Sequence, residues 1–165
     1  MGYLPVYSGM NTKNLVSLIV FLAICLGIAA LSGLATVANI PTWYEALTKP
    51  SFTPPNWIFG PVWTVLYILI AISGWMVWRK IGFSPERPLI IYGLQLALNF
   101  AWSFVFFGAH LIGLAVVNIV LMWLAIAWNI ALFWRVDPVA AILLLPYLVW
   151  VSFASALNIA VWQLN

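Results

Sequence analysis

The amino-acid sequence predicts an all-α membrane protein, a single domain over residues 1–165 built as a bundle of five transmembrane helices. The first observation is composition: 66% of the residues are hydrophobic, 5% are charged and the mean hydropathy is +1.12. A soluble domain carries about 25% charged residues, so lipid is the solvent that suits this chain. The second observation is that the uncharged runs have the length of membrane spans, and the third is an unusual content of 11 tryptophans.

Composition also excludes several classes of function. Nucleic-acid binding needs clustered Lys and Arg, whereas the net charge of +3 is spread thinly along this chain. Cys25 has no second cysteine to pair with and lies in an apolar run, which is typical of a small buried side chain. His110 has no second His or Cys as a co-ligand, so no metal site is predicted.

The first predicted span covers residues 15–38, which carry no charge. A spanning helix needs about 20 apolar residues to cross a hydrocarbon core about 30 Å thick. The run is longer than the apolar core of a signal peptide, which has about 7–15 residues, so we expect a retained helix.

The segment that follows, residues 39–55, is the one long connection in the predicted bundle. It is amphipathic, contains Trp43 and Tyr44, and ends in proline-rich turns. Aromatic side chains of this kind anchor interfacial segments, and long ordered loops often have a function of their own. We therefore expect either an interfacial anchor or a lid over a cavity between the helices, and the sequence leaves both open.

The second predicted span covers residues 56–78. It follows Pro54 and Pro55 and contains Pro61. Proline is tolerated in the first turn of a helix, so this helix should start near Asn56.

The third and fourth spans come from one uncharged stretch, residues 88–134. As a single helix it would be about 70 Å long, more than twice the thickness of the bilayer core, so it must fold back. The glycines Gly108 and Gly113 mark the best turn, which gives spans over residues 89–108 and 112–134.

The fifth span, residues 138–162, begins with Pro138 in the first helical position. Five crossings place the N-terminus and two loops on one side of the membrane, and that side carries Lys13, Arg79, Lys80, Arg87 and Arg135. The other side carries Lys49 as its only Lys or Arg. In a cytoplasmic membrane this asymmetry predicts a cytoplasmic N-terminus.

Polar residues of the third span lie on one helical face. Gln95, Asn99, Trp102 and Phe106 are spaced by four, three and four residues. Polar side chains within a bilayer face the bundle interior or a cavity, because lipid cannot satisfy their hydrogen bonds. This face should therefore line the interior of the bundle.

The opposite face of the third span carries a row of three small residues. Gly93, Ala97 and Ala101 form a small-xxx-small pattern, which allows close helix contact. This seam serves either packing within the monomer or a homodimer contact, and both remain open.

Three other spans carry comparable stripes. They comprise Trp63, Tyr67, Ile70 and Gly74 on the second span, Asn118, Met122, Ala125 and Asn129 on the fourth, and Tyr147, Trp150, Ala154, Asn158 and Val161 on the fifth. Facing inward, these stripes would form an aromatic pocket with a few amide and phenol groups, which suits a large, flat, hydrophobic ligand. Core packing is the alternative explanation for the deeper tryptophans, whereas those at helix ends are typical of an interfacial belt.

Three segments resemble the translocator protein family (TspO/MBR), also called the tryptophan-rich sensory protein or peripheral-type benzodiazepine receptor family. They are WYEALTKPSFTPPNWIFGPVWTVLY (43–67), QLALNFAWSFVFF (95–107) and PYLVWVSFASALNIAVWQLN (146–165). The likeness covers the chain from residue 15 onward. It implies a five-helix bundle that commonly forms homodimers, with a first loop over a pocket for porphyrins, haem-pathway tetrapyrroles and synthetic benzodiazepine-site ligands.

The resemblance also implies which residues bind the ligand. The lid motif contributes Trp43 and Tyr44, and the pocket positions are Trp63, Tyr67, Gln95, Asn99, Trp102, Tyr147, Trp150, Ala154 and Asn158. No cofactor is required on this interpretation, and protoporphyrin IX or a haem-like tetrapyrrole is the ligand.

One stretch departs from the animal members of the family, which end their fifth helix with a cholesterol-recognition pattern. Residues 157–165 contain neither the Tyr nor the basic residue of that pattern, so cholesterol binding through it is not expected. The short tail resembles a microbial member. This predicts the bacterial cell membrane as the location, with the mitochondrial outer membrane as the alternative.

The function implied by the resemblance is that of a membrane receptor or carrier for porphyrins, with a sensing, regulatory or transport role in tetrapyrrole metabolism. The alternative is light-dependent oxidative breakdown of porphyrin at Trp63 or Trp150. Ordinary acid–base or nucleophilic catalysis is not expected, because Glu45, Glu86 and Asp137 lie in separate loops. A coupled transporter is disfavoured, because the sequence shows no internal repeat and no charge within a span.

Overall fold

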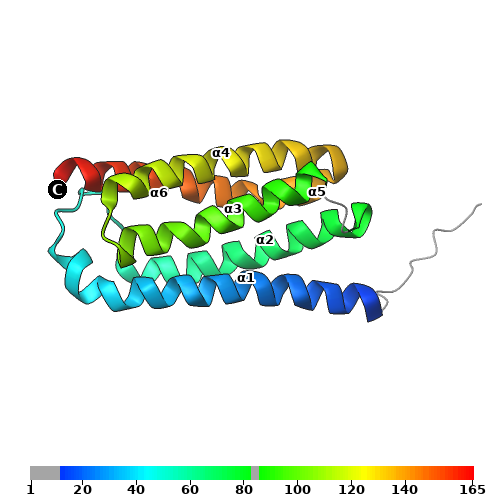
Figure 1. The fold of residues 1–165 in the computed structure, drawn as a ribbon, viewed down its shortest axis with the longest axis horizontal. Coiled ribbons are helices and arrows are strands. Elements are labelled where there is room, and N and C mark those ends of the chain that lie inside the picture. Colours follow the sequence, from blue (N-terminus) through cyan, green and yellow to red (C-terminus); the bar gives the residue numbers. More distant parts are fainter. Residues whose placement is uncertain (1–11, 83–85) are drawn as a thin grey trace, which may run out of the picture.

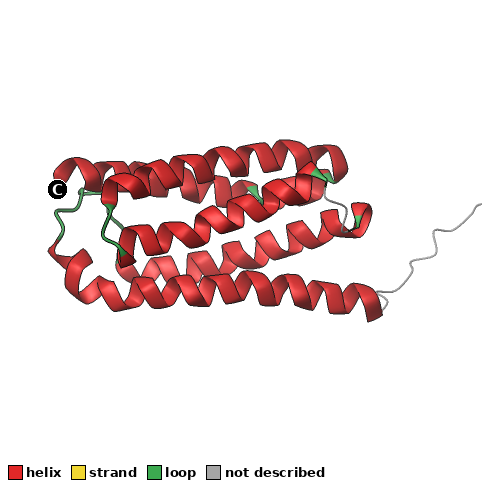
Figure 2. Ribbon diagram, viewed as in Figure 1, coloured by secondary structure: helices red, strands yellow, loops and turns green. Residues whose placement is uncertain are grey.

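The computed structural model describes residues 12–82 and 86–165, and these residues form a bundle of long helices (Figures 1 and 2). Five helical segments are long and apolar enough to cross a membrane: Thr12–Tyr44, Asn56–Ile81, Arg87–Gly108, Ile112–Val136 and Pro138–Leu164. Within the described residues no strand is present. The predicted fold class, an all-α bundle of five transmembrane helices, is confirmed.

The first span consists of α1 (Thr12–Asn39) and a wider π-helical turn, η1 (Ile40–Tyr44). Pro41 lies in the first two positions of η1. Proline has no N–H to donate to the α-helical ladder, which accounts for the change of hydrogen-bonding pattern at this point. The helix then continues to Ala46, so the predicted loop over residues 39–55 is shorter in the structure than the sequence suggested.

The second span begins with a short 3-10 turn, η2 (Asn56–Ile58), and continues as α2 (Phe59–Ile81). Gly82 ends this helix with a positive φ of 70°, and its N–H donates to the carbonyl of Trp78. Glycine adopts this left-handed conformation without steric cost, which is why it is common at helix ends.

The third span consists of α3 (Arg87–Ser103) and a second π-helical turn, η3 (Phe104–Gly108), and α4 (Ile112–Val136) follows. The tight turn between them places His110 at a φ of 59°, a conformation that is uncommon for a residue with a side chain. The N–H of Ala109 bonds to the carbonyl of Phe104 at 2.7 Å, which closes the π turn.

The fifth span is divided into α5 (Pro138–Leu143) and α6 (Leu145–Leu164), whereas the sequence predicted one continuous helix. Pro146 explains the break at Leu144, because it removes one ladder hydrogen bond and its ring crowds the preceding turn. Asp137 caps α5 by accepting hydrogen bonds from the N–H groups of Val139 and Ala140.

The interior of the bundle contains two buried clusters. The larger one joins all the spans around residues such as Ile70, Ile126 and Tyr147, and the smaller one lies at the end where η1 and η3 meet, around Tyr44 and Phe106. Many large hydrophobic side chains remain exposed on the outer surface, as lipid contact requires. Figure 1 shows η1, η3 and the C-terminus at the same end of the bundle, which positions the candidate site described next.

Candidate ligand-binding site

A cavity of about 560 Å³ lies in the half of the bundle that contains η1, η3 and the C-terminus, which we call the lid half. Its walls come from α1, η1, η2, α2, α3, η3, α4 and α6, so every span contributes to it. Eight of the eleven predicted ligand-binding residues line it: Tyr44, Trp63, Tyr67, Asn99, Trp102, Trp150, Ala154 and Asn158. The inward-facing stripes of α2, α3 and α6 therefore meet around one cavity.

The floor of the cavity is a chain of hydrogen bonds between three buried side chains. The Tyr67 hydroxyl donates to Asn99 Oδ1 at 2.7 Å, and Asn99 Nδ2 donates to the Tyr147 hydroxyl oxygen at 2.7 Å. These bonds join α2, α3 and α6, and Tyr147 itself lies behind the cavity wall, fully buried. Buried polar groups satisfied in this way hold neighbouring helices in one arrangement.

A second polar contact fixes the side wall. Trp102 Nε1 donates to Asn158 Oδ1 at 3.0 Å, which joins α3 to α6. The Trp102 ring also stacks on Phe106 with 5.1 Å between ring centroids and 16° between planes. The indole of Trp102 therefore presents a fixed flat surface to the cavity.

Two further tryptophans form the wall between α2 and α6. Trp63 packs against Tyr67 and Tyr147 with centroid separations of 5.7 and 6.1 Å. Trp150 contacts Phe59 edge-on at 5.8 Å, and its Nε1 has no hydrogen-bond partner among the described residues. The Nε1 atom is itself buried, so the carbon face of the ring, and not the N–H, forms the surface of the cavity here.

The connecting segment 39–55 covers the cavity through Tyr44, which is buried and packs against Phe106 and Phe107. We therefore call this segment the lid. Lys49 holds its helical part in place: the ammonium lies 4.9 Å from the centre of the Tyr44 ring and donates to the carbonyls of Glu45 and Leu47.

The middle of the lid is fastened, at Thr48, to the C-terminus of α6. The backbone N–H of Thr48 donates to Asn165 Oδ1 at 2.9 Å, and Asn165 Nδ2 donates back to the Thr48 carbonyl at 3.0 Å. This reciprocal pair is exposed, so it can open without unpacking the bundle.

Three predicted ligand-binding residues do not line the cavity. Trp43 lies outside it and stacks on His110, with 4.2 Å between ring centroids, while His110 Nε2 lies 3.2 Å from Asn39 Oδ1. Tyr147 is behind the floor. Gln95 is 1% exposed, and neither atom of its amide has a hydrogen-bond partner among the described residues.

The first span also contributes to the cavity, which was not predicted from the sequence. Ser32, Gly33 and Thr36 of α1 line the cavity, and the Thr36 hydroxyl donates to the Ser32 carbonyl. Small and hydroxyl-bearing residues at positions i and i+4 of an apolar helix are the signal that would have identified this face.

The cavity is uncharged. Within the described part of the chain, its lining contains no Asp, Glu, Lys, Arg or His, and no group of three or more potential metal ligands occurs. The charges of this half lie on the outside, on Glu45 and Lys49 of the lid. The cavity can therefore hold an apolar, aromatic molecule by stacking and by a few directed hydrogen bonds.

The predicted small-residue seam faces outward. Gly93 and Ala97 are exposed, Ala101 is half-buried, and no atom lies within 4 Å of the position that a Cβ would occupy at Gly93. Gly93 and Ala97 therefore face away from the interior of the bundle.

The fold and the cavity define an integral membrane protein of five helices that encloses an uncharged aromatic site beneath a lid. The TspO/MBR family profile matches residues 21–163 of this chain. Protein CrtK of Rhodobacter capsulatus is 37% identical over 154 residues, which cover 90% of this chain and 94% of that protein. The chain belongs to the TspO/MBR family.

Relatives from other domains of life agree with this assignment. The tryptophan-rich protein TspO of Archaeoglobus fulgidus is 39% identical over 152 residues, which cover 92% of this chain and 99% of that protein. The human translocator protein is 44% identical over 126 residues, which cover 74% of this chain and 75% of that protein. The resemblance noted from the sequence is thereby confirmed.

Proposed function

We propose that this protein is a membrane receptor or carrier for porphyrins and related hydrophobic ligands, with a sensing, regulatory or transport role in tetrapyrrole metabolism. The observation that carries the proposal is the uncharged cavity of about 560 Å³ with Trp63, Trp102 and Trp150 in its walls. A flat macrocycle gains most from stacking on such rings.

The polar groups also suggest an orientation for a porphyrin such as protoporphyrin IX. Burying an ionised carboxylate in an uncharged cavity is costly. The carboxylates of the ligand should therefore remain outside the cavity, on the side of Lys49, whose ammonium lies 4.9 Å from the centre of the Tyr44 ring, while the macrocycle enters between the tryptophans.

Titration of the purified protein with protoporphyrin IX tests the proposal through the Soret absorbance of the porphyrin. We expect saturable binding that is strongly weakened in the double variant Trp63→Phe/Trp150→Phe. The matched control is Trp128→Phe/Trp134→Phe, because both of these tryptophans are exposed on α4. Equal binding by both double variants would contradict the pocket assignment.

The alternative function is light-dependent oxidation of the bound porphyrin by dioxygen. The location of both Trp63 and Trp150 in the cavity wall favours it, since an indole ring next to the macrocycle is a redox-active group. Illumination of the complex with and without dioxygen, compared with a dark sample, tests this function. A product that forms equally fast without protein would exclude it.

We also propose that the outward-facing seam of Gly93, Ala97 and Ala101 forms the contact of a homodimer. The variant Gly93→Leu/Ala97→Leu should then run as a monomer in light-scattering measurements in detergent. Ala131→Leu places the same bulk on an exposed position of α4 and serves as the control. An unchanged mass for the double variant would refute this contact.

For the orientation we propose a cytoplasmic N-terminus in a bacterial cell membrane. The helix ends at Lys13, Arg79, Arg87 and Arg135 lie at one end of the bundle, opposite the lid. Because Cys25 is buried, a cysteine introduced at Glu86 can be labelled selectively. It should react with an impermeant maleimide in inside-out vesicles and stay unlabelled in intact cells.

A further inference from the structure

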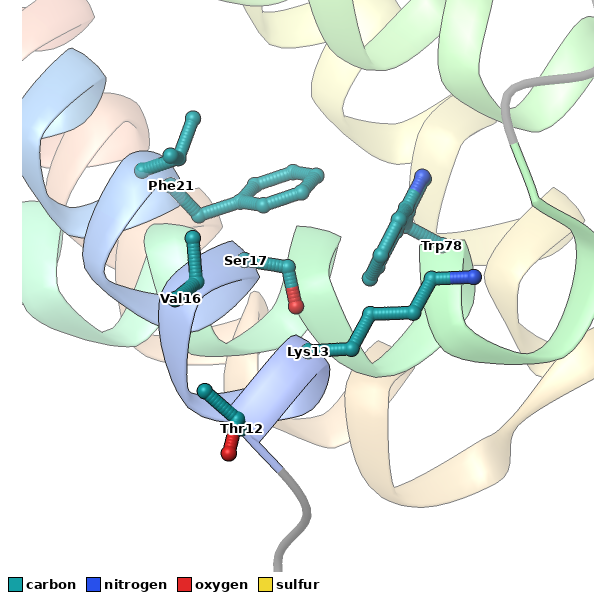
Figure 3. Close-up of a pocket in the computed structure, with 7 residues that line it drawn as sticks. Thr12, Lys13, Val16, Ser17, Phe21 and Trp78 are labelled. Atoms are coloured by element: carbon teal, nitrogen blue, oxygen red, sulfur yellow. The ribbon is translucent and has the colours of Figure 1, made fainter.

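A groove lies at the end of the bundle opposite the lid, between the first turns of α1 and the end of α2 (Figure 3). Its volume is about 390 Å³. It is separate from the ligand cavity, since the two share no lining residue among those that the structure describes. Figure 3 shows the Lys13 side chain extending along the groove toward the ring of Trp78.

The walls of the groove are apolar and firmly placed. Val16 and Val20 form one side and are exposed to the surrounding lipid, and Phe21 packs on Trp78 with 6.1 Å between ring centroids. The hydroxyl of Ser17 is already engaged, because it donates to the Asn14 carbonyl and accepts from Trp75 Nε1. The groove therefore offers hydrocarbon contact along its length.

The charges beside the groove are positive. Lys13 lies at its mouth, and Arg79 lies one turn along α2 from Trp75, with its guanidinium 4.6 Å from the centre of the Trp75 ring. In the described part of the chain the one ion pair joins Lys80 to Asp137. Lys13 and Arg79 are thus available to an anion from outside the chain.

We propose that this groove is a binding site for an anionic phospholipid, such as phosphatidylglycerol. One acyl chain lies between Val16, Val20 and Phe21, and the phosphate accepts hydrogen bonds from the Lys13 ammonium, with the Arg79 guanidinium over Trp75 as a second cation at this end of the bundle. The combination of an apolar groove with unpaired cations at its polar end matches an anionic lipid better than a neutral one. Trp78 lies at the boundary between the two regions, where tryptophan is favoured.

Native mass spectrometry of the purified full-length protein tests the site. The protein is titrated with phosphatidylglycerol and with phosphatidylcholine of the same acyl chains. We expect preferential retention of one phosphatidylglycerol, a several-fold loss of that preference in Lys13→Gln, and loss of both lipids from the site in Val16→Trp, which fills the groove. Arg135→Gln removes a cation at the same end, on α4, and should leave the preference unchanged.

Photocrosslinking places the bound lipid independently of the variants. A phosphatidylglycerol with a diazirine in its acyl chain should label the peptides that contain Val16 to Phe21 and Trp78. Equal retention of both lipids by the wild type, an unchanged preference in Lys13→Gln, or labelling confined to other helices would each overturn the proposal. Competition by free glycerol 3-phosphate as effective as that by the lipid would show a phosphate site instead of a lipid site, and would also overturn it.

Discussion

The two halves of the bundle are built from the same helices, yet one encloses the ligand cavity, whereas the interior of the other, which we call the solid half, is filled by side chains beneath the surface groove. At the solid end the Tyr92 ring fills the space left by Gly74, its hydroxyl donates to the Ile70 carbonyl at 3.1 Å, and its ring stacks on Phe133. In the lid half, nothing lies within 4 Å of the Cβ position at Gly33. Gly74 therefore allows close packing in one half, whereas Gly33 leaves open space beside the cavity in the other.

This contrast assigns different tasks to the two halves. The solid half fixes the arrangement of the helices, so that the lid half can keep a cavity without collapsing. Side chains that line a cavity lack van der Waals contacts on one side, and the packing of the surrounding structure must offset that loss of stability. The hydrogen-bond chain through Asn99 lies at the boundary between the halves.

The largest effect is expected at this boundary. Asn99→Leu leaves the hydroxyls of Tyr67 and Tyr147 without their partner and should lower the free energy of unfolding by about 2–4 kcal/mol, since each buried polar group left unpaired costs about 1–3 kcal/mol. Gln95→Leu, one turn away, removes an amide that has no described partner and should cost much less. Denaturant titration in detergent measures both; equal losses would show that Gln95 is hydrogen-bonded as tightly as Asn99.

The two glycines provide the next test. Gly74→Ala places a methyl group against the Tyr92 ring and should destabilise the protein by about 1–3 kcal/mol. Gly33→Ala meets open space and should stabilise the helix by about 0.5–1 kcal/mol, while it narrows the ligand cavity. Shifts of the unfolding temperature with opposite signs in the two variants would support the contrast between the halves, and shifts of the same sign would contradict it.

A smaller effect is expected from the lid fastening. Asn165→Ala removes the exposed pair with Thr48 and should change stability by less than about 1 kcal/mol. It should nevertheless speed the release of bound porphyrin in stopped-flow experiments, because the lid then opens more often. A release rate equal to that of the wild type would mean that ligand exchange does not pass through the lid.

The smallest effect concerns pH at the solid end. The hydrogen bond from Lys80 and the helix-capping bonds to Ala140 and Val139 lower the pKa of Asp137 below its ordinary value of 3.8. A lowered folded-state pKa means that this stabilisation is present at neutral pH and is lost as the pH falls below about 4, through the folded pKa. The pair is partly exposed, so Lys80→Met should remove less than about 1 kcal/mol. The free energy of unfolding should differ less between pH 7 and pH 3 in this variant than in the wild type.

Much of this architecture could be predicted from residue spacing. Charge-free runs revealed the five spans, and the four- and three-residue spacing of Gln95, Asn99 and Trp102 identified the inner face of α3. Periodicity defines which face of a helix turns inward, but it does not give the depth of a side chain along that face. This is why Gln95 and Tyr147 fall behind the cavity wall although they share a stripe with residues that line it.

Other features were not predicted, each for its own physical reason. The stripe of Ser32, Gly33 and Thr36 is weak in an otherwise uniformly apolar helix, and only the packing of α1 on α2 shows that it turns inward. The break before Pro146 was obscured because the run around it is uncharged. The turns η1 and η3 differ from the α-helix in which backbone groups are hydrogen-bonded, and the spacing of hydrophobic residues does not reveal that difference.

The two π turns have a consequence for how the site exchanges its ligand. They meet over the cavity, where Tyr44 of η1 packs against Phe106 and Phe107 of η3. Each is closed by a bond that spans five residues, from Glu45 to Ile40 and from Ala109 to Phe104, and such turns are less stable than the α-helix on either side. The points of easiest unwinding therefore lie at η1 and η3, within the first and third spans. If these two turns act as hinges when the ligand enters, their amide protons should exchange with water before the other amide protons of the same spans.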